Sequence, residues 1–216
     1  MKNKKKIILI DYGVGNILSI KNAINYLGHE VKLSSNILEL ESASHVILPG
    51  VGSFPSAINK LSKIKLIETI KKIALSEVFI LGICLGMQLL FSRSFEFKET
   101  PGLKILEGDI KFLQDIKNLK SIKLPHIGWN NLIIGKNISN PILKNITSKD
   151  YFYFIHSYAA FNTKNNSNNV FTKYNGIYFP AIVQNENVFG CQFHPEKSSK
   201  SGLKILKNFI DLYFLY

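Results

Sequence analysis

The sequence contains little cysteine: Cys84 and Cys191 are the two cysteines among 216 residues. Two thiols cannot form the framework of several disulfides that stabilises small secreted domains. A chain of this length can also bury a sizeable core without disulfides or metals. We therefore expect both cysteines to be reduced and the protein to be cytoplasmic.

Long hydrophobic runs are absent as well, although hydrophobic residues make up 46% of the chain. No apolar stretch approaches the roughly 20 residues that a helix needs to cross a bilayer. The first six residues carry four lysines, but the apolar stretch that follows, Ile7–Ile10, is too short for the core of a signal peptide. These patterns predict a soluble protein with no membrane segment and no export signal.

Arginine is nearly absent, since Arg93 is the single example, whereas the formal net charge is +12. The positive charge comes from lysines that are scattered along the chain, with no cluster beyond the first six residues. Faces that bind nucleic acids gather Lys and Arg next to aromatic side chains that stack on bases. The composition therefore argues against a nucleic-acid partner.

Short β-branched segments alternate with amphipathic segments, a pattern typical of an α/β fold. We predict a central, mostly parallel sheet flanked by helices, a smaller β-rich portion after Pro101, and a single domain over residues 1–216. The predicted strands are 7–10, 30–33, 45–48, 77–83, 108–113, 127–133, 151–156, 181–184 and 188–193. One helix is predicted after the turn at 11–16, and others are predicted to begin at Ser53, Leu85 and Gly202, the last of them ending at Leu215. The polar segment 162–169 is predicted to be a surface loop.

The first glycine-rich turn, Gly13-Val14-Gly15, follows a predicted strand and opens a predicted helix. A dinucleotide-binding turn requires a third glycine, and Leu18 stands in its place. The turn is therefore interpreted as a tight strand-to-helix connection, and no cofactor is expected.

The segment Gly82-Ile83-Cys84-Leu85-Gly86 has the pattern of a nucleophile elbow with cysteine as its central residue. The flanking glycines allow a sharp strand-to-helix turn that exposes the sulfur at a helix N-terminus. Unpaired amides there favour both a thiolate and an oxyanion, and the Leu85 amide is the expected oxyanion donor. Cys191 lacks such a frame and is interpreted as a small buried residue.

A cysteine nucleophile needs a base and a group that orients the base, and Phe193-His194-Pro195-Glu196 supplies both. His194 would accept the thiol proton and return a proton to the leaving group, while Glu196 would hold the imidazole in the correct tautomer. A His-x-Glu triplet can also be half of a metal site. Because no second pair of ligands has zinc-like spacing, we expect no metal.

Six motifs in order carry a resemblance that covers almost the whole chain. The motifs are Asp11-Tyr12-Gly13-x-Gly15-Asn16, Leu48-Pro49-Gly50-Val51-Gly52-x-Phe54, Gly82-Ile83-Cys84-Leu85-Gly86-Met87-Gln88, Pro125-His126-x-Gly128-Trp129-Asn130, His156-Ser157-Tyr158 and Gln192-Phe193-His194-Pro195-Glu196-Lys197-Ser198. In these motifs the sequence resembles the glutaminase subunits of imidazole glycerol phosphate synthase, the HisH family of class I glutamine amidotransferases.

The resemblance implies a catalytic triad of Cys84, His194 and Glu196 that converts L-glutamine to glutamate and ammonia through a glutamyl thioester. It also implies two further groups of site residues. Val51 and Gly52 would belong to an oxyanion strand whose amide is reoriented when the synthase subunit holds its own ligand. The residues expected to hold glutamine are Gln88, Glu96, Ser157 and Tyr158, with Glu96 facing the α-ammonium group.

The resemblance further implies a separate cyclase subunit of (β/α)₈ type, which uses the ammonia to make imidazole glycerol phosphate and AICAR in histidine biosynthesis. Asn16, Trp129 and Lys197 match positions at the interface between the subunits. Some residues matched at the interface and at the glutamine site have a simpler alternative: Trp129 could be a core residue, Lys197 a solvated charge and Tyr158 a strand aromatic.

Three departures from the family's pattern keep alternatives open: Arg93-Ser94-Phe95 replaces a more acidic stretch, residues 97–118 are less typical, and the surroundings of Cys191 resemble those in paralogues. Such paralogues supply ammonia for amidated sugars of surface polysaccharides. Two other classes are an independent cysteine hydrolase, which would work without a partner, and a non-catalytic scaffold. A scaffold predicts loss of catalytic residues, and none is missing.

Overall fold

The computed structural model describes residues 5–116, 122–136, 138–163 and 168–214. Parts of the predicted surface loop at 162–169, and the predicted end of the last helix at Leu215, lie outside these residues. Among the described residues, no helix is both long enough and apolar enough to cross a membrane.

Among the described residues, seven strands form the largest sheet, in the order β11-β12-β13-β4-β3-β1-β2. Neighbouring strands from β2 to β13 run parallel, whereas β12 is antiparallel to β13 and to β11. This arrangement confirms the predicted mostly parallel central sheet. The strand bounds are β1 Ile7–Ile10, β2 Val31–Ser34, β3 His45–Leu48, β4 Phe79–Ile83, β11 Val170–Tyr174, β12 Ile177–Asn185 and β13 Val188–Cys191.

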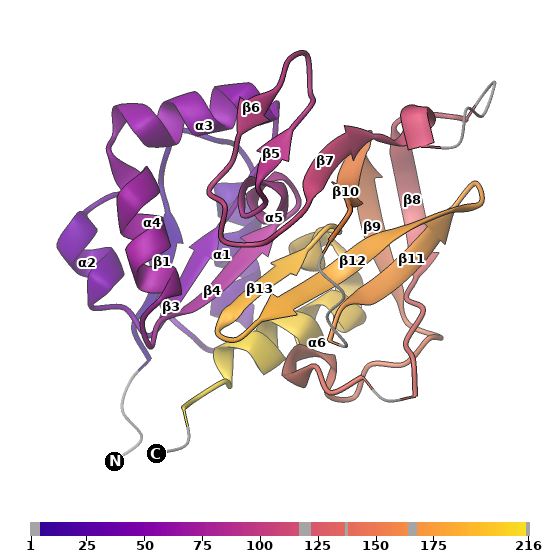
Figure 1. Cartoon of the computed structure of the whole chain (residues 1–216). Coiled ribbons are helices and arrows are strands. Elements are labelled where there is room, and N and C mark those ends of the chain that lie inside the picture. Colours follow the sequence, from indigo (N-terminus) through magenta and orange to yellow (C-terminus); the bar gives the residue numbers. More distant parts are fainter. Residues whose placement is uncertain (1–4, 117–121, 137, 164–167, 215–216) are drawn as a thin grey trace.

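Helices cover both faces of this sheet (Figure 1). Side chains of β1 point alternately to the two faces of the sheet. Ile7 and Leu9 pack into one hydrophobic cluster with residues of α1 and α6. Ile8 and Ile10 pack into a second cluster with residues of α3 and α4. Because both faces are covered, the inner parallel strands β1, β3 and β4 are almost continuously apolar, whereas the edge strand β2 contains Lys32 and Ser34. The helix bounds are α1 Ile17–Tyr26, α2 Ile37–Glu41, α3 Phe54–Lys63, α4 Leu66–Ala74, α5 Leu85–Leu89 and α6 Ser199–Ile210.

The remaining strands form a smaller β-rich portion as predicted, but its strands at 93–94 and 100–101 precede the predicted start after Pro101. A four-stranded sheet has the order β10-β7-β5-β6, and β8 pairs with β9 in a separate antiparallel ribbon. The bounds are β5 Arg93–Ser94, β6 Thr100–Pro101, β7 Asp109–Phe112, β8 His126–Asn131, β9 Tyr151–His156 and β10 Tyr158–Phe161. Short 3₁₀ turns lie at η1 Leu113–Ile116, η2 Pro141–Leu143 and η3 Pro195–Lys197.

Two helix predictions are corrected by the structure. The helical stretch after Ser53 is two helices, because Lys65 between them adopts a left-handed conformation with φ 57°. The last helix is Ser199–Ile210, so it begins before Gly202 and ends before the predicted Leu215, since residues 212–214 are not helical. Gly202 instead allows the helix to approach η3, since a Cβ atom there would lie 1.9 Å from the carbonyl oxygen of Pro195.

The parallel strands bring the predicted motifs to one edge of the sheet. The segments 11–16, 49–52, 84–88 and 192–196 directly follow β1, β3, β4 and β13, and these four strands are consecutive neighbours in the order β13-β4-β3-β1. Ligand sites of open α/β sheets lie at the carboxyl ends of the strands. The topology therefore places the predicted catalytic segments together.

Candidate active site

Cys84 lies in the strained turn that the elbow motif predicts. Its backbone has φ 53° and ψ −109°, and α5 begins at the next residue. A Cβ atom on Gly86 would lie 1.9 Å from the carbonyl oxygen of Leu48, and one on Gly82 would lie 2.7 Å from the backbone nitrogen of Met87. Only glycine permits these contacts, so the two glycines allow the turn to pack against β3 and α5.

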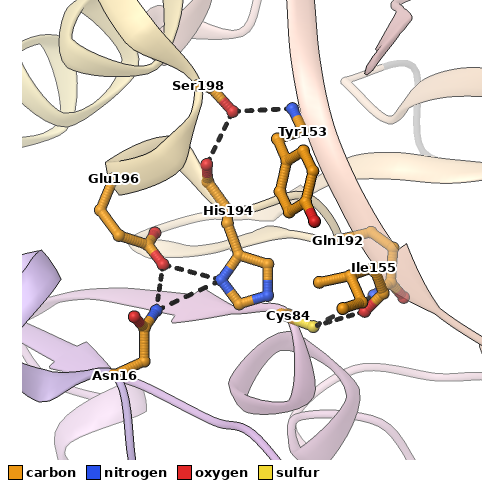
Figure 2. A network of polar contacts seen from close by, with 8 residues as sticks. All are labelled: Asn16, Cys84, Tyr153, Ile155, Gln192, His194, Glu196 and Ser198. Atoms are coloured by element: carbon orange, nitrogen blue, oxygen red, sulfur yellow. Dashed lines mark hydrogen bonds and ion pairs between the residues drawn. The ribbon is translucent and has the colours of Figure 1, made fainter. Parts of the chain in front are cut away.

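His194 and Glu196 form the hydrogen-bonded pair that the sequence predicts. Nδ1 of His194 lies 2.7 Å from Oε1 of Glu196, and both side chains are almost fully buried. Figure 2 shows the second ring nitrogen of His194 turned toward the sulfur of Cys84. With Nδ1 protonated and donating to Glu196, the other nitrogen is free to accept the thiol proton.

The backbone of His194 is fixed by β9 and by the start of the last helix. Its amide donates to the carbonyl oxygen of Tyr153 at 2.9 Å. Its carbonyl oxygen accepts a hydrogen bond from the hydroxyl of Ser198 at 2.6 Å, and the same hydroxyl oxygen accepts the Tyr153 amide at 2.9 Å (Figure 2). These bonds hold the imidazole beside the elbow.

The charge state of His194 follows from its neighbours. Burial disfavours the charged ring, but hydrogen bonds with Cys84 and Glu196 outweigh burial and raise the pKa of His194 to about 10. A ring in this environment readily holds a proton taken from the thiol. The geometry therefore suits a cysteine nucleophile with a histidine base.

Asn16, predicted at a subunit interface, lies half-buried beside the triad. Its amide nitrogen donates to Oε1 of Glu196 and lies 3.4 Å from Nδ1 of His194 (Figure 2). Its backbone is left-handed, with φ 71°. This contact was not foreseen from the sequence, because it joins residues 180 positions apart.

A cavity of about 300 Å³ opens beside the sulfur of Cys84. Cys84 and His194 line this cavity, together with every residue that the sequence predicts to bind glutamine or to stabilise the oxyanion. The lining residues are Val51, Gly52, Cys84, Leu85, Gln88, Glu96, Pro125, Ile155, His156, Ser157, Tyr158 and His194.

Glu96 supplies an acid to this cavity. Its Oε2 accepts the Phe54 amide at the start of α3 at 2.6 Å. Burial raises the pKa of the Glu96 carboxyl, and the bond from Phe54 opposes that rise. A partly desolvated carboxylate of this kind suits a cationic group of a ligand.

The loop that contains Val51 and Gly52 is held at its first residue. The buried hydroxyl of Tyr12 donates to the carbonyl oxygen of Pro49 at 2.6 Å. Gly52 has φ +100°, a conformation that L-residues rarely adopt. The loop is therefore anchored at Pro49 while its tip faces the cavity.

Sequence reasoning gave no individual role to Gln192, although it lies within a quoted motif. This fully buried side chain contacts both Gln88 and the sulfur of Cys84. The signal in the sequence would have been an amide residue two positions before His194, at the end of an apolar strand, because buried polar groups need partners.

The other predicted residues lie outside the cavity lining. Trp129 is half exposed on β8, where its ring meets that of Tyr153 edge to face at 6.0 Å. Lys197 is exposed on η3. Cys191 is fully buried and burial raises the pKa of its thiol, which agrees with its interpretation as a small buried residue. Within the described ranges, no cluster of three or more His, Cys, Asp or Glu side chains could hold a metal ion.

Known proteins similar to this chain include members of one enzyme family. The model of the family "Glutamine amidotransferase class-I" matches residues 8–212. The imidazole glycerol phosphate synthase subunit HisH of Caldanaerobacter subterraneus subsp. tengcongensis is 48% identical over 202 residues, covering 93% of this chain and 95% of that protein. The HisH subunit of Methanocaldococcus jannaschii is 44% identical, covering 94% of this chain and 98% of its own length.

Solved structures show the same fold at lower identity. The structure of PurLQS from Thermotoga maritima superposes with a TM-score of 0.71 at 22% identity, covering 96% of this chain and 98% of that chain. A crystal structure described as a glutamine amidotransferase gives a TM-score of 0.70 at 17% identity, covering 94% of this chain and 97% of the other. The α/β fold predicted from the sequence is thereby confirmed. Together with the matches along the sequence, these findings show that the chain belongs to the class I glutamine amidotransferases and, among them, to the HisH family.

Proposed function

We propose that this chain is the glutaminase subunit of an imidazole glycerol phosphate synthase, acting as one domain over residues 1–216 in the cytoplasm. It hydrolyses glutamine to glutamate and ammonia, and a separate cyclase subunit uses the ammonia in histidine biosynthesis. The observation that carries this proposal is the pairing of Cys84 with the buried His194–Glu196 pair beside one cavity, in a chain 48% identical to a HisH subunit.

In the proposed reaction, the sulfur of Cys84 attacks the side-chain amide carbon of glutamine while His194 takes the thiol proton. His194 then gives that proton to the departing amide nitrogen, so that ammonia leaves and a glutamyl thioester remains. A water molecule, deprotonated by His194, attacks the thioester carbon. Glutamate is released and the thiol is restored.

Charge on the carbonyl oxygen would be stabilised at the start of α5. The Leu85 amide belongs to the first turn of this helix, and Val51 and Gly52 line the same cavity. We propose that these backbone groups form the oxyanion site. Glu96 would bind the α-ammonium group, while Ser157 and Tyr158 line the cavity with Gln88.

We also propose that the ribbon of β8 and β9 contributes to the binding site for a (β/α)₈ cyclase subunit. Its outward face presents Ile127, Trp129, Tyr151 and Ile155, all at least 39% exposed. Aromatic residues on an exposed apolar face are typical of protein interfaces. Lys197 lies on η3, which contacts β9, and Asn16 lies beside Glu196. We assign both to the same interface region.

The test is glutamate release by the chain alone, then with a cyclase subunit from the same organism and that subunit's nucleotide substrate. We expect weak activity alone, strong stimulation by the liganded partner, and loss of both in Cys84→Ala. Equal turnover without the partner would instead support an independent hydrolase. Unchanged activity of Cys84→Ala would refute the nucleophile. Because the curated relatives reported above are HisH subunits, the polysaccharide alternative is not favoured.

A further inference from the structure

Gln192 is a fully buried amide that the triad does not use. It lies between the end of β13 and His194. Its Nε2 lies 3.8 Å from the sulfur of Cys84, and its Oε1 lies 3.0 Å from Nε2 of Gln88. Figure 2 shows Gln192 next to Ile155, on the side of the sulfur opposite His194.

The orientation of both amides is fixed by a backbone carbonyl. The carbonyl oxygen of Tyr158 can only accept, so the Gln88 atom that lies 2.9 Å from it must be the amide nitrogen. The same nitrogen faces Gln192, which must therefore present its oxygen to Gln88. The NH₂ group of Gln192 is left pointing at Cys84, without the ambiguity that amide side chains usually have.

The carbonyl of Tyr158 is itself held by a pair of buried histidines. It accepts a hydrogen bond from Nδ1 of His156 at 2.8 Å, and Nε2 of His156 lies 3.0 Å from Nδ1 of His126. Since Nδ1 of His156 must be the donor, Nε2 accepts from His126. Burial, and secondarily the nearby His126, lowers the pKa of His156 to about 3, so the pair is neutral near pH 7.

Two neighbours of the sulfur favour opposite protonation states. The carbonyl oxygen of Ile155, 3.9 Å from the sulfur, can accept a hydrogen bond from a thiol but offers nothing to a thiolate. The amide of Gln192 can donate to a thiolate, and hydrogen bonds to charged groups are the stronger kind. Loss of the thiol proton therefore moves the sulfur's hydrogen bonding from Ile155 to Gln192.

We propose that Gln192 stabilises and positions the Cys84 thiolate through its amide, and that Gln88 and the carbonyl of Tyr158 fix that amide in the donating orientation. The proposal rests on the proposed role of Cys84 as nucleophile. It also gives Gln88 a second role, since both hydrogens of its NH₂ group are used within the protein and only its oxygen remains for a ligand.

Other titratable groups around the sulfur must stay unchanged in any test of this proposal. They are His194 and Glu196 after β13, Tyr12 after β1, His156 on β9, and Glu96 and Tyr158 across the cavity. A substitution at Gln192 that carries no charge meets this condition.

The experiment is the rate of alkylation of Cys84 by iodoacetamide as a function of pH, in the full chain without a partner. Replacing Gln192 by methionine keeps the approximate length of the side chain and removes the donor. We expect the pH profile of Gln192→Met to lie about one unit above the parent profile, so that the variant reacts about tenfold more slowly along the rising part of the curve. Gln184→Met is the matched control, because Gln184 lines a different cavity, and Cys84→Ser measures any reaction of Cys191.

A profile for Gln192→Met that coincides with the parent profile, in a variant with an unchanged melting temperature, overturns the proposal. If that variant does not fold, Gln192→Leu provides the second test, since it also removes the donor and adds no charge beside the sulfur. We expect its profile to move up as well, and an unmoved profile overturns the proposal. Alkylation requires no glutaminase activity, so the result is separate from the outcome of the Cys84→Ala assay.

Discussion

Nδ1 of His194 and Oε1 of Glu196 lie 2.7 Å apart, and the Glu196 side chain is fully buried. A buried carboxylate at this distance fixes the ring so that its other nitrogen faces Cys84. The consequences for activity can be tested by removing the charge of Glu196 while keeping its shape.

We expect Glu196→Gln to lower kcat for glutamate release by roughly 10³- to 10⁴-fold, because an amide at this place allows the wrong imidazole tautomer. The measurement is steady-state glutaminase activity with the cyclase partner present. Glu68→Gln makes the same change in an exposed pair with Lys71 and should stay within about twofold. A Glu196→Gln variant as active as that control would contradict the orienting role.

Glu96→Gln should raise KM for glutamine by about tenfold or more, with a smaller effect on kcat, because it removes the negative charge offered to the α-ammonium group. The Phe54 amide can still be accepted by the new side-chain oxygen, so the start of α3 should remain intact. Initial rates over a range of glutamine concentrations give KM and kcat for each variant. Glu99→Gln, on the adjoining exposed segment, is the control, and a KM equal to that of the control would remove Glu96 from the binding site.

Gly86→Ala should destabilise the fold by about 1–3 kcal/mol or more, because its Cβ atom would lie 1.9 Å from the carbonyl oxygen of Leu48. Gly135→Ala is the matched control: the nearest atom to its Cβ would be 3.6 Å away, an ordinary contact. The free energy of unfolding in urea gives the difference. Equal values for the two variants would show that β3 and the elbow can separate without cost.

Acidification should destabilise the protein through its buried neutral histidines. Burial lowers the pKa of His45 and of His126 to about 4, below the unfolded value of about 6.5. The unfolded chain therefore binds more protons between these values, and the stability present above pH 6.5 is lost as pH falls toward 4.

The contribution of His45 can be isolated by His45→Phe, since this side chain already stacks on Phe79. We expect the free energy of unfolding of this variant to fall less steeply between about pH 6.5 and 4.5, by up to about 1.4 kcal/mol per pH unit. His29→Phe, at a partly exposed histidine, is the comparison. Parallel curves for His45→Phe and the parent protein would contradict the prediction.

His194 acts in the opposite direction. Its pKa is raised to about 10, so the stability it contributes is fully present below pH 6.5 and is lost as pH rises toward 10. Unfolding measured from about pH 7 to 10 in Cys84→Ala should show a weaker decline than in the parent protein, because the Cys84 partner of the ring is gone. An identical decline would contradict the coupling between the two side chains.

Trp129→Ala should weaken binding of the cyclase subunit by about tenfold or more, since large aromatics dominate interface energies. Isothermal titration calorimetry measures the affinity. Tyr178→Ala removes another half-exposed aromatic, on β12, and should leave affinity unchanged. Equal affinities for both variants would place the interface elsewhere.

Local sequence determined the apolar strands and the chemistry of the site. Ile7–Ile10 and His45–Leu48 are short apolar runs with the predicted bounds. The glycines around Cys84 identify the elbow. His194 and Glu196 are two positions apart in the sequence, so any fold keeps them near each other. These features depend on neighbours within a few residues, so the sequence alone was enough to find them.

Tertiary structure decided the features that depend on distant partners. Strands β5 and β6 have two residues each, and pairing rather than composition defines them. The β11 segment begins with alternating buried and exposed residues, a strand pattern that the sequence prediction missed. The break at Lys65 and the early start of α6 arise from packing that local periodicity does not record.

The polar contacts around the triad show the same division. The sequence named Gln88, Glu96 and Asn16, but only the folded chain turns Gln88 toward Gln192, Glu96 toward Phe54 and Asn16 toward Glu196. These partners are 42 to 180 residues apart. The identity of the reacting groups is thus a local property of the sequence. Their orientation is set by the parallel sheet, because it brings the carboxyl ends of separate strands to one edge.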